Sequence, residues 1–175
     1  LRSSLAGVIL TMLELNLGDV SRFPFIDPPK PAMVREGLAE LLELGAVETD
    51  GYGTPRLTPV GRRLARIPVE PRLARMLLEA SRLATLPSVL PVVAALSCED
   101  PRRRPVDERE KAREAHAHFR VPGSDFLGTL KLWRWYDGEA ESASQAKLRK
   151  LCKASYLSFP KMREWRDLVR QLVEL

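Results

Sequence analysis

The sequence predicts a mainly α fold with one small β-hairpin, and three observations carry this prediction. Apolar residues recur at intervals of three and four over most of the chain, as they do along one face of an α-helix. One turn-rich stretch, Asp50–Gly53, is flanked by two short extended segments. Hydrophobic residues make up 45% of the 175 residues and aromatic residues only 6%, so the core is expected to consist mostly of Leu, Val and Ala.

No apolar run reaches the roughly 20 residues that a membrane-spanning helix needs. No basic stretch followed by a hydrophobic signal segment opens the chain either. We therefore expect no membrane partner and a cytoplasmic location. The chain begins at Leu1 rather than Met, and its last helical pattern stays apolar to Leu175, so we expect a segment of a larger protein.

Residues 1–68 are predicted to form a first domain. Its first helix follows Ser3 and Ser4, which can act as N-caps, and Gly18 can end it. The apolar face of that helix consists of Leu5, Val8, Ile9, Met12 and Leu13. Four prolines between Pro24 and Pro31 then predict an extended connector, because proline removes a backbone donor and restrains its neighbours.

A second helix is predicted from about residue 32 to residue 44, with Gly45 at its C′ position. The segments on either side of Asp50–Gly53 then predict a hairpin over residues 46–57. Thr58 followed by Pro59 is typical of an N-cap and a first helical position, which predicts a short helix. Two or three helices and one hairpin form a winged-helix-like set of elements.

Residues 69–175 are predicted to form a second domain, an all-α bundle of five or six helices. A basic loop bounded by Pro101 and Pro105 leads into a highly charged helix over residues 106–119. Ser124 is the expected N-cap of the next helix, whose apolar face carries Leu127, Leu130, Trp133 and Tyr136. A polar loop is expected at Asp137–Ser142, before a helix that starts near Ser144 and a final one at residues 162–173.

Catalytic motifs are absent from this sequence. It contains no GxxxxGK[ST] phosphate loop, and Asp107–Glu110 lacks the apolar strand that a metal-binding DExx box requires. His116 and His118 stand two residues apart, point to different faces of a helix, and are interpreted as surface residues. Cys98 and Cys152 are interpreted as reduced, core or half-buried thiols. We expect no catalytic residue, no metal site and no cofactor in this chain.

The charge distribution favours a polyanionic partner. The net charge is +5, and ten arginines lie between Arg56 and Arg104 against four acidic residues in the same stretch. Arginine can pair with phosphate through its planar guanidinium fork, so nucleic acid is one candidate partner. The alternative is that an Arg- and Ala-rich chain reflects a GC-rich genome.

An ordered series of short strings resembles the region that follows the motor domains of DEAH-box RNA helicases. The series runs through Leu17-Gly18-Asp19, Phe23-Pro24-Phe25-Ile26-Asp27-Pro28-Pro29, Leu44-Gly45-Ala46, Leu57-Thr58-Pro59-Val60-Gly61-Arg62, Ile67-Pro68-Val69-Glu70-Pro71-Arg72-Leu73-Ala74, Ala94-Ala95-Leu96-Ser97, Arg104-Pro105 and Ser124-Asp125-Phe126-Leu127. The last string is closer to bacterial HrpA-like members of this family. The match spans nearly the whole chain and is looser after Leu151.

The resemblance implies a winged-helix domain followed by a helical, ratchet-like bundle, together called the helicase-associated region. It also implies a division of labour: motor domains in cis bind ATP and Mg²⁺ and hydrolyse ATP, while this region forms part of the channel for single-stranded RNA, with DNA as an alternative strand. The parent protein is thus expected to be an ATP-dependent RNA helicase, and this chain alone should be inactive as an ATPase.

A translocating enzyme must tolerate any sequence, so its strand contacts should be mostly positive charges and hydrogen-bond donors. The candidate nucleic-acid-binding residues are Arg72, Arg75, Arg102, Arg103, Arg104, Ser124 and Asp125. Asp125 cannot attract a phosphate, so it is expected to cap its helix or to accept a hydrogen bond from a base or ribose. For each arginine a surface ion pair, such as Arg75 with Glu79, is the alternative.

Two other functions remain open at this stage. A freestanding winged-helix DNA-binding regulator would read a duplex with the helix at residues 32–44, but that helix carries three acids and one arginine. A protein-docking module could instead use the charged helix at residues 106–119.

Overall fold

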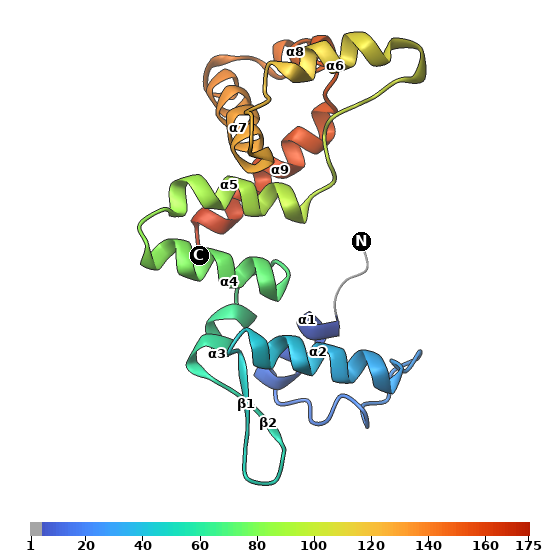
Figure 1. Ribbon diagram of the computed structural model, residues 1–175, viewed down its shortest axis with the longest axis vertical. Coiled ribbons are helices and arrows are strands. Elements are labelled where there is room, and N and C mark those ends of the chain that lie inside the picture. The colour runs from blue at the N-terminus through green and yellow to red at the C-terminus, as the bar shows by residue number, and fades with distance from the viewer. Residues whose placement is uncertain (1–4) are drawn as a thin grey trace. The chain divides into compact units, whose positions relative to one another are not determined.

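The computed structural model describes residues 5–175, so the expected capping role of Ser3 and Ser4 lies outside the described residues. Within that range the chain forms nine α-helices, one short 3₁₀ helix and one two-stranded antiparallel hairpin (Figure 1). The mainly α fold class is therefore confirmed. Among the described residues, no helix combines the length and the apolar character that a membrane crossing requires.

The chain divides into two compact units, one ending at Leu83 and one spanning Ala84–Leu175. The sequence predicts a boundary at residues 68/69 between a winged-helix domain and a helical bundle. That boundary stays a prediction. The helix that follows this position lies with the first compact unit.

The first unit consists of α1 (Leu5–Glu14), α2 (Pro31–Glu43), β1 (Val47–Thr49), β2 (Pro55–Leu57), α3 (Pro59–Ala65) and α4 (Pro71–Arg82). Its core is aliphatic, as the composition predicts: Ile9, Leu41 and Leu64 are almost wholly buried. Phe23 and Phe25, from the proline-rich connector, pack against this core with their ring centroids 4.8 Å apart.

The end of α1 differs from the sequence prediction. Asn16, not Gly18, adopts the left-handed conformation that ends the helix, with φ 54°. Its neighbour Leu17 donates a backbone hydrogen bond of 3.0 Å to the Met12 carbonyl, which closes the last turn. Gly18 also has positive φ, 85°, but it lies beyond the helix end, in the extended segment that follows. Asn tolerates the left-handed region better than most residues, which is why the helix can stop two residues early.

The hairpin is confirmed where it was expected. β1 and β2 pair antiparallel in a register that sets Val47 opposite Leu57 and Glu48 opposite Arg56. The Asp50 carboxylate closes the turn by accepting hydrogen bonds from the backbone N–H groups of Tyr52, at 3.0 Å, and Thr54, at 2.9 Å. The Thr54 bond is the largest cause of a lowered pKa for Asp50, and the charge of Arg56 adds to it.

Thr58 caps α3, as predicted, and also ties this helix to the end of α2. Its hydroxyl oxygen accepts from the Gly61 N–H at 3.0 Å, and the hydroxyl donates to the Gly45 carbonyl at 2.6 Å. Gly61 lies directly against the Ala46 carbonyl, and a Cβ at this position would overlap it. This close approach requires glycine.

The second unit consists of α5 (Leu86–Ser97), η1 (Val106–Glu108), α6 (Arg109–Ala117), α7 (Asp125–Ser142), α8 (Gln145–Ala154) and α9 (Phe159–Val173). Tyr136, Leu132, Leu157, Met162 and Trp165 are among its most deeply buried large side chains. Trp133 is buried, as its place on the predicted apolar face requires, and Trp165 is buried too, with its indole N–H donating 2.8 Å to the Pro91 carbonyl. Pro91 itself lies inside α5.

The polar loop expected at Asp137–Ser142 is wrong, because α7 continues through these residues to Ser142. Residues such as Glu139 and Ala140 favour helix, and the Asp137 carboxylate is held at 2.9 Å by Nε of Arg166 from α9. The chain leaves α7 only at Ala143, and Ser144 caps α8 by accepting from the Lys147 N–H at 3.3 Å.

Candidate functional site

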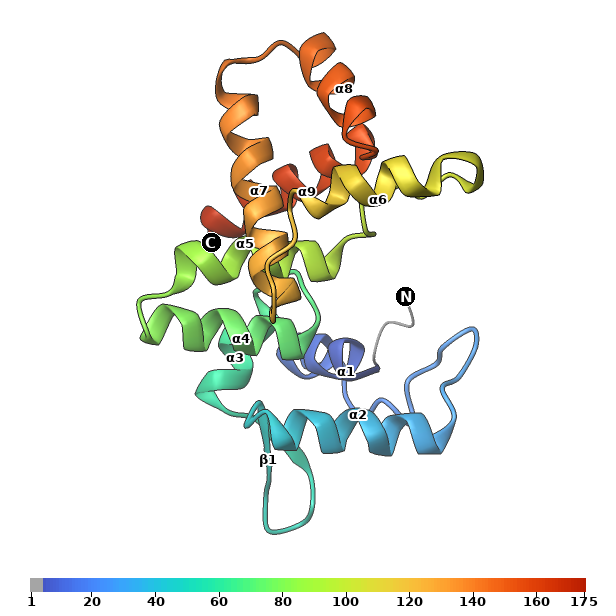
Figure 2. The same cartoon turned by 45° about the horizontal axis from the view of Figure 1, so that its top comes forward.

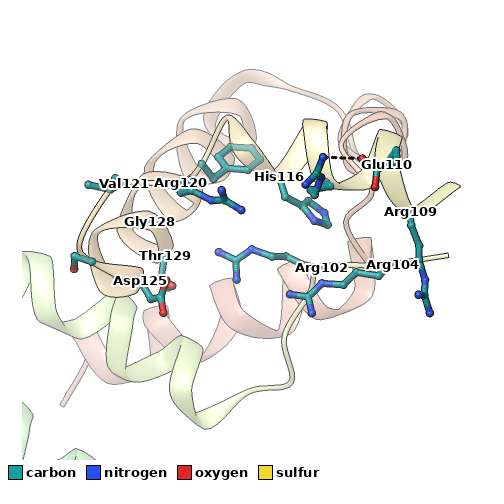
Figure 3. A pocket seen from close by; sticks show the side chains of 13 residues that line it. Arg102, Arg104, Arg109, Glu110, His116, Arg120, Val121, Asp125, Gly128 and Thr129 are labelled. Carbon is teal, nitrogen blue, oxygen red and sulfur yellow. Dashed lines mark ion pairs between the residues drawn. The ribbon is translucent and has the colours of Figure 1, made fainter. Parts of the chain in front are cut away.

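An arginine-rich cavity of about 750 Å³ opens in the second unit (Figure 3). Its walls come from the extended segment after α5, from α6, from the link between α6 and α7, and from the first turn of α7. The lining residues are Arg102, Arg104, Arg109, Glu110, Arg113, His116, Phe119, Arg120, Val121, Ser124, Asp125, Gly128 and Thr129. We refer to it as the arginine cavity.

Positive charge dominates the lining, with five arginines against two acids. Arg113 pairs with Glu110 at 2.8 Å, and Nη1 of Arg102 lies 3.4 Å from an Asp100 carboxylate oxygen. The other three, Arg104, Arg109 and Arg120, are exposed and have no carboxylate within 4 Å among residues 5–175. These three guanidinium groups remain available to an anionic ligand.

The extended segment that carries Arg102 and Arg104 is fixed by backbone hydrogen bonds to the turn between α8 and α9. The Arg103 N–H donates 2.8 Å to the Tyr156 carbonyl, and the Ser158 N–H donates 2.8 Å to the Pro101 carbonyl. Arg102 and Leu157 therefore form an isolated antiparallel bridge. A loop predicted only as basic and proline-bounded is in fact held in one conformation.

The same Tyr156 carbonyl also fixes the opposite wall. Nε2 of His116 on α6 lies 3.1 Å from it, within hydrogen-bonding distance. The interpretation of His116 as a surface residue is wrong, because α6 packs against the α8–α9 turn and leaves the imidazole half-buried. His118 is exposed, as expected. One carbonyl thus joins the basic segment, α6 and the α8–α9 turn.

The first turn of α7 forms the far end of the cavity, where Figure 3 places Asp125 and Thr129. Ser124 caps the helix by accepting from the Leu127 N–H at 3.2 Å. Gly128 allows the preceding link to pass close by, since a Cβ there would lie 3.0 Å from the Phe119 carbonyl oxygen. The N-terminus of an 18-residue helix adds a partial positive charge to this end.

Four of the seven predicted site residues line the arginine cavity: Arg102, Arg104, Ser124 and Asp125. Arg103 is exposed beside it and contributes its backbone N–H to the fixed segment. The structure does not place Arg72 and Arg75 in this cavity. They lie on α4 of the first unit, where Arg72 pairs with Glu40 at 3.1 Å and Arg75 pairs with Glu79 at 3.6 Å.

Sequence reasoning missed the contributions of Arg109, Arg113, His116 and Arg120. The first three recur at intervals of four and three on α6, so one face of a helix was their only shared signal. The sequence predicted only a highly charged helix here, with His116 as a surface residue. The docking of α6 beside the basic segment turns it into a cavity wall.

Comparison with known families assigns the chain to one of them, through a match that includes α4 of the first unit and ends before α9. Residues 70–157 match the helicase associated domain (HA2), ratchet-like family. The chain belongs to this family. The matched region contains all residues of the arginine cavity.

Full-length relatives agree with this family assignment. The chain is 41% identical over 173 residues to the ATP-dependent RNA helicase HrpA of Escherichia coli (strain K12), and 41% identical over 175 residues to its homologue from Haemophilus influenzae. It is 33% identical over 181 residues to the pre-mRNA-splicing factor ATP-dependent RNA helicase DEAH10 of Arabidopsis thaliana. The resemblance to DEAH-box RNA helicases is confirmed.

These alignments cover nearly all of the chain but little of the relatives. They span 98% of the chain and 13% of each bacterial protein, and 99% of the chain and 25% of the plant protein. The chain therefore corresponds to a small part of proteins that are named as RNA helicases.

Proposed function

We propose that this chain is an accessory segment of an ATP-dependent DEAH-box RNA helicase and forms part of the channel for single-stranded RNA. The observation that carries the proposal is the arginine cavity, which lies inside the matched helicase-associated region and keeps three arginines without acidic partners among the described residues. The names of the relatives support RNA as the nucleic acid.

The chemistry of the cavity suits the backbone of a moving strand. Guanidinium groups bind phosphate oxygens through paired N–H donors, whatever base is attached. Arg104 comes from the segment after α5 and Arg120 from the link between α6 and α7, and both would hold phosphates of the strand (Figure 3). Ser124 and Asp125 at the start of α7 would bind ribose hydroxyls or base edges, since a carboxylate accepts hydrogen bonds and repels phosphate.

ATP and Mg²⁺ belong to the motor domains in this proposal. The chain carries no phosphate-loop motif, so its part is to hold the strand while the motors use ATP for translocation and unwinding. Arg72 and Arg75 on α4 remain proposed strand contacts, and RNA phosphates would have to replace the carboxylates with which they now pair.

The test is fluorescence anisotropy of the 175-residue chain with a labelled, mixed-sequence single-stranded RNA at low and high salt. We expect weak, sequence-indifferent binding that decreases with salt, and no ATP turnover. Replacing Arg104 and Arg120 with Ala should reduce the slope of log affinity against log salt by about 1.4, at about 0.7 for each lost single-strand contact.

The matched control replaces Lys131 and Arg134, two exposed cations of α7 outside the cavity, with Ala. This variant has the same net charge as the cavity variant and should keep most of the affinity. If the two variants lose affinity equally, the cavity is not the binding site. A labelled duplex DNA bound far better than the single-stranded RNA would favour a DNA-binding regulator.

A further inference from the structure

A second basic surface lies on α8, outside the arginine cavity. The helix contains Lys147, Arg149, Lys150 and Lys153 and no acidic residue. The whole second unit holds 17 Lys and Arg residues against 13 Asp and Glu. The second unit thus has a net charge of +4, and the ten residues of α8 also carry a net charge of +4. The charge of this one helix therefore equals the net positive charge of the whole unit. None of these ten residues lines the arginine cavity.

The four cations occupy one continuous side of the helix. Leu148 and Cys152 are buried on the opposite side and fix the orientation of α8, while all four basic residues are exposed. Lys147 and Lys153 are six residues apart, which is about 9 Å along the axis. In Figure 2, α8 lies at the end of the second unit that is away from α5.

Intramolecular contacts leave most of this charge free. Lys147 reaches a Glu139 carboxylate oxygen at 3.8 Å, and the Arg149 guanidinium lies over the Phe159 ring, 5.3 Å from its centroid. Lys150 and Lys153 have no carboxylate within 4 Å in the described part of the chain. Four adjacent cations repel one another, so a polyanion bound here would relieve that repulsion and release counterions.

The composition of the surface indicates what kind of polyanion fits. Protein-binding surfaces carry large apolar or aromatic anchors in their centre, and α8 exposes no large hydrophobic side chain. Binding sites for single strands use aromatic rings on which bases stack, but α8 itself carries no aromatic residue, and the Phe159 ring beside it is half-buried and covered by Arg149. The exposed side of α8 therefore presents flexible, positively charged side chains that can bind phosphates, and it presents no groups that recognise bases.

We propose that the α8 surface binds the phosphate backbone of a nucleic-acid duplex, independently of sequence. A duplex hides its bases and carries one charge per roughly 1.7 Å of its axis, twice the density of one strand, which matches a surface of charges without stacking groups. The binding site goes beyond the proposed function and uses other residues than the arginine cavity. The α8 surface would hold the double-stranded part of an RNA, while the arginine cavity holds the separated single strand.

The test compares two probes, a blunt-ended RNA duplex and a single-stranded RNA, with the full chain and three double variants. One variant is Lys150→Glu with Lys153→Glu on α8. The second is Arg104→Glu with Arg120→Glu in the cavity. The third, Lys131→Glu with Arg134→Glu on α7, makes the same charge change at exposed positions outside both surfaces. Circular dichroism checks that each variant is folded.

We expect the α8 variant to bind the duplex about ten-fold more weakly, with a salt slope lower by about 1.8 for two lost contacts. Its affinity for the single strand should stay close to that of the α7 control. The cavity variant should lose affinity for the single strand and keep a duplex affinity close to that of the α7 control. Duplex affinity that is equal in the α8 and α7 variants overturns the duplex site and leaves the proposed function standing. If all three variants lose single-strand affinity equally, while only the α8 variant loses duplex affinity, the arginine cavity is not the single-strand site and the duplex site on α8 still stands.

Discussion

At the scale of single residues, backbone geometry and burial have a larger effect on stability than charge does. Gly61 illustrates this, because the α3 backbone touches the Ala46 carbonyl at the point where α2 ends and the hairpin begins. Cys152 illustrates the effect of burial, since it is wholly enclosed between α8 and the rest of its unit. For each of these two positions, the direction of the expected change in stability can be stated and tested.

Replacing Gly61 with Ala should lower the free energy of unfolding by about 1–3 kcal/mol, the usual cost of forcing an extra group into a packed site. The control is Gly138→Ala in α7, where a Cβ would meet no atom within 4 Å. That change should instead stabilise the chain by about 0.5–1 kcal/mol, the helix preference of Ala over Gly. Urea unfolding of both variants measures the difference, and equal effects would contradict the close approach.

Burial raises the pKa of the Cys152 thiol from 9.0 to about 11. The neutral thiol is thus favoured in the folded state, so its contribution to stability is complete below pH 9 and is lost as the pH rises towards 11. Burial also raises the pKa values of Cys98 and Tyr136, which act in the same direction.

We therefore expect the midpoint of urea unfolding to fall as the pH rises from 9 to about 11. Cys152→Ala should reduce this fall without abolishing it. In the folded chain, iodoacetamide should modify the half-buried Cys98 before Cys152. Faster modification of Cys152 would show that α8 opens easily.

At the scale of elements, helix caps connect stability with the candidate site. Ser124 satisfies the Leu127 N–H at the start of α7 and also lines the arginine cavity. Loss of an N-cap side chain costs about 1 kcal/mol. Ser124→Ala should therefore lower stability by about that amount.

Ser144→Ala, at the N-cap of α8, is the control for Ser124→Ala, since it removes an equivalent bond of 3.3 Å outside the cavity. Both variants should be destabilised to a similar degree in thermal unfolding. Only Ser124→Ala should also weaken binding of single-stranded RNA. Equal RNA affinities would remove Ser124 from the site while leaving its capping role.

The helices and caps were predictable because their signals are local. Thr58 with Pro59, Gly45 after α2, and Ser124 before α7 each act within a few residues of the element they bound. The polar sequence at Asp137–Ser142 misled, because the Arg166 ion pair that supports the helix comes from α9. Local pattern contains no information about a partner 29 residues away.

The candidate site was predictable only in part, for the same reason. The basic segment and the cap of α7 have sequence signals of their own, so Arg102, Arg104, Ser124 and Asp125 could be chosen in advance. The α6 wall depends on the docking of His116 against the Tyr156 carbonyl, 40 residues further along the chain.

At the scale of the whole molecule, each compact unit has a core of its own. The first unit buries the aliphatic cluster around Leu41 and Leu64, and the second buries Tyr136 and Trp165 together with Leu132 and Met162. The positive surplus also differs between them, since residues 1–83 contain 11 Lys and Arg residues against 10 Asp and Glu. The charged ligand should thus bind mainly to the second unit.

A polypeptide of residues 84–175 should therefore fold alone and keep most of the single-stranded RNA affinity of the full chain. Circular dichroism should show a helical spectrum with a cooperative thermal transition, and anisotropy should give a salt dependence like that of the full chain. A helical, cooperatively melting polypeptide that no longer binds RNA would assign the affinity to the first unit, where Arg72 and Arg75 would be the residues to examine next.

The double use of the Tyr156 carbonyl has a consequence for mutational tolerance. The junction needs a backbone oxygen at position 156 and a left-handed residue, since Tyr156 has φ 52°. Gly and Asn adopt that conformation at little cost, whereas Val and Ile do not. A saturation library selected for RNA binding should accordingly accept Gly or Asn at position 156, and it should keep at position 116 only side chains that can donate a hydrogen bond. Such variants would lose the hydrogen bond between the Tyr156 hydroxyl and Glu108 while keeping the shape of the chain at that point.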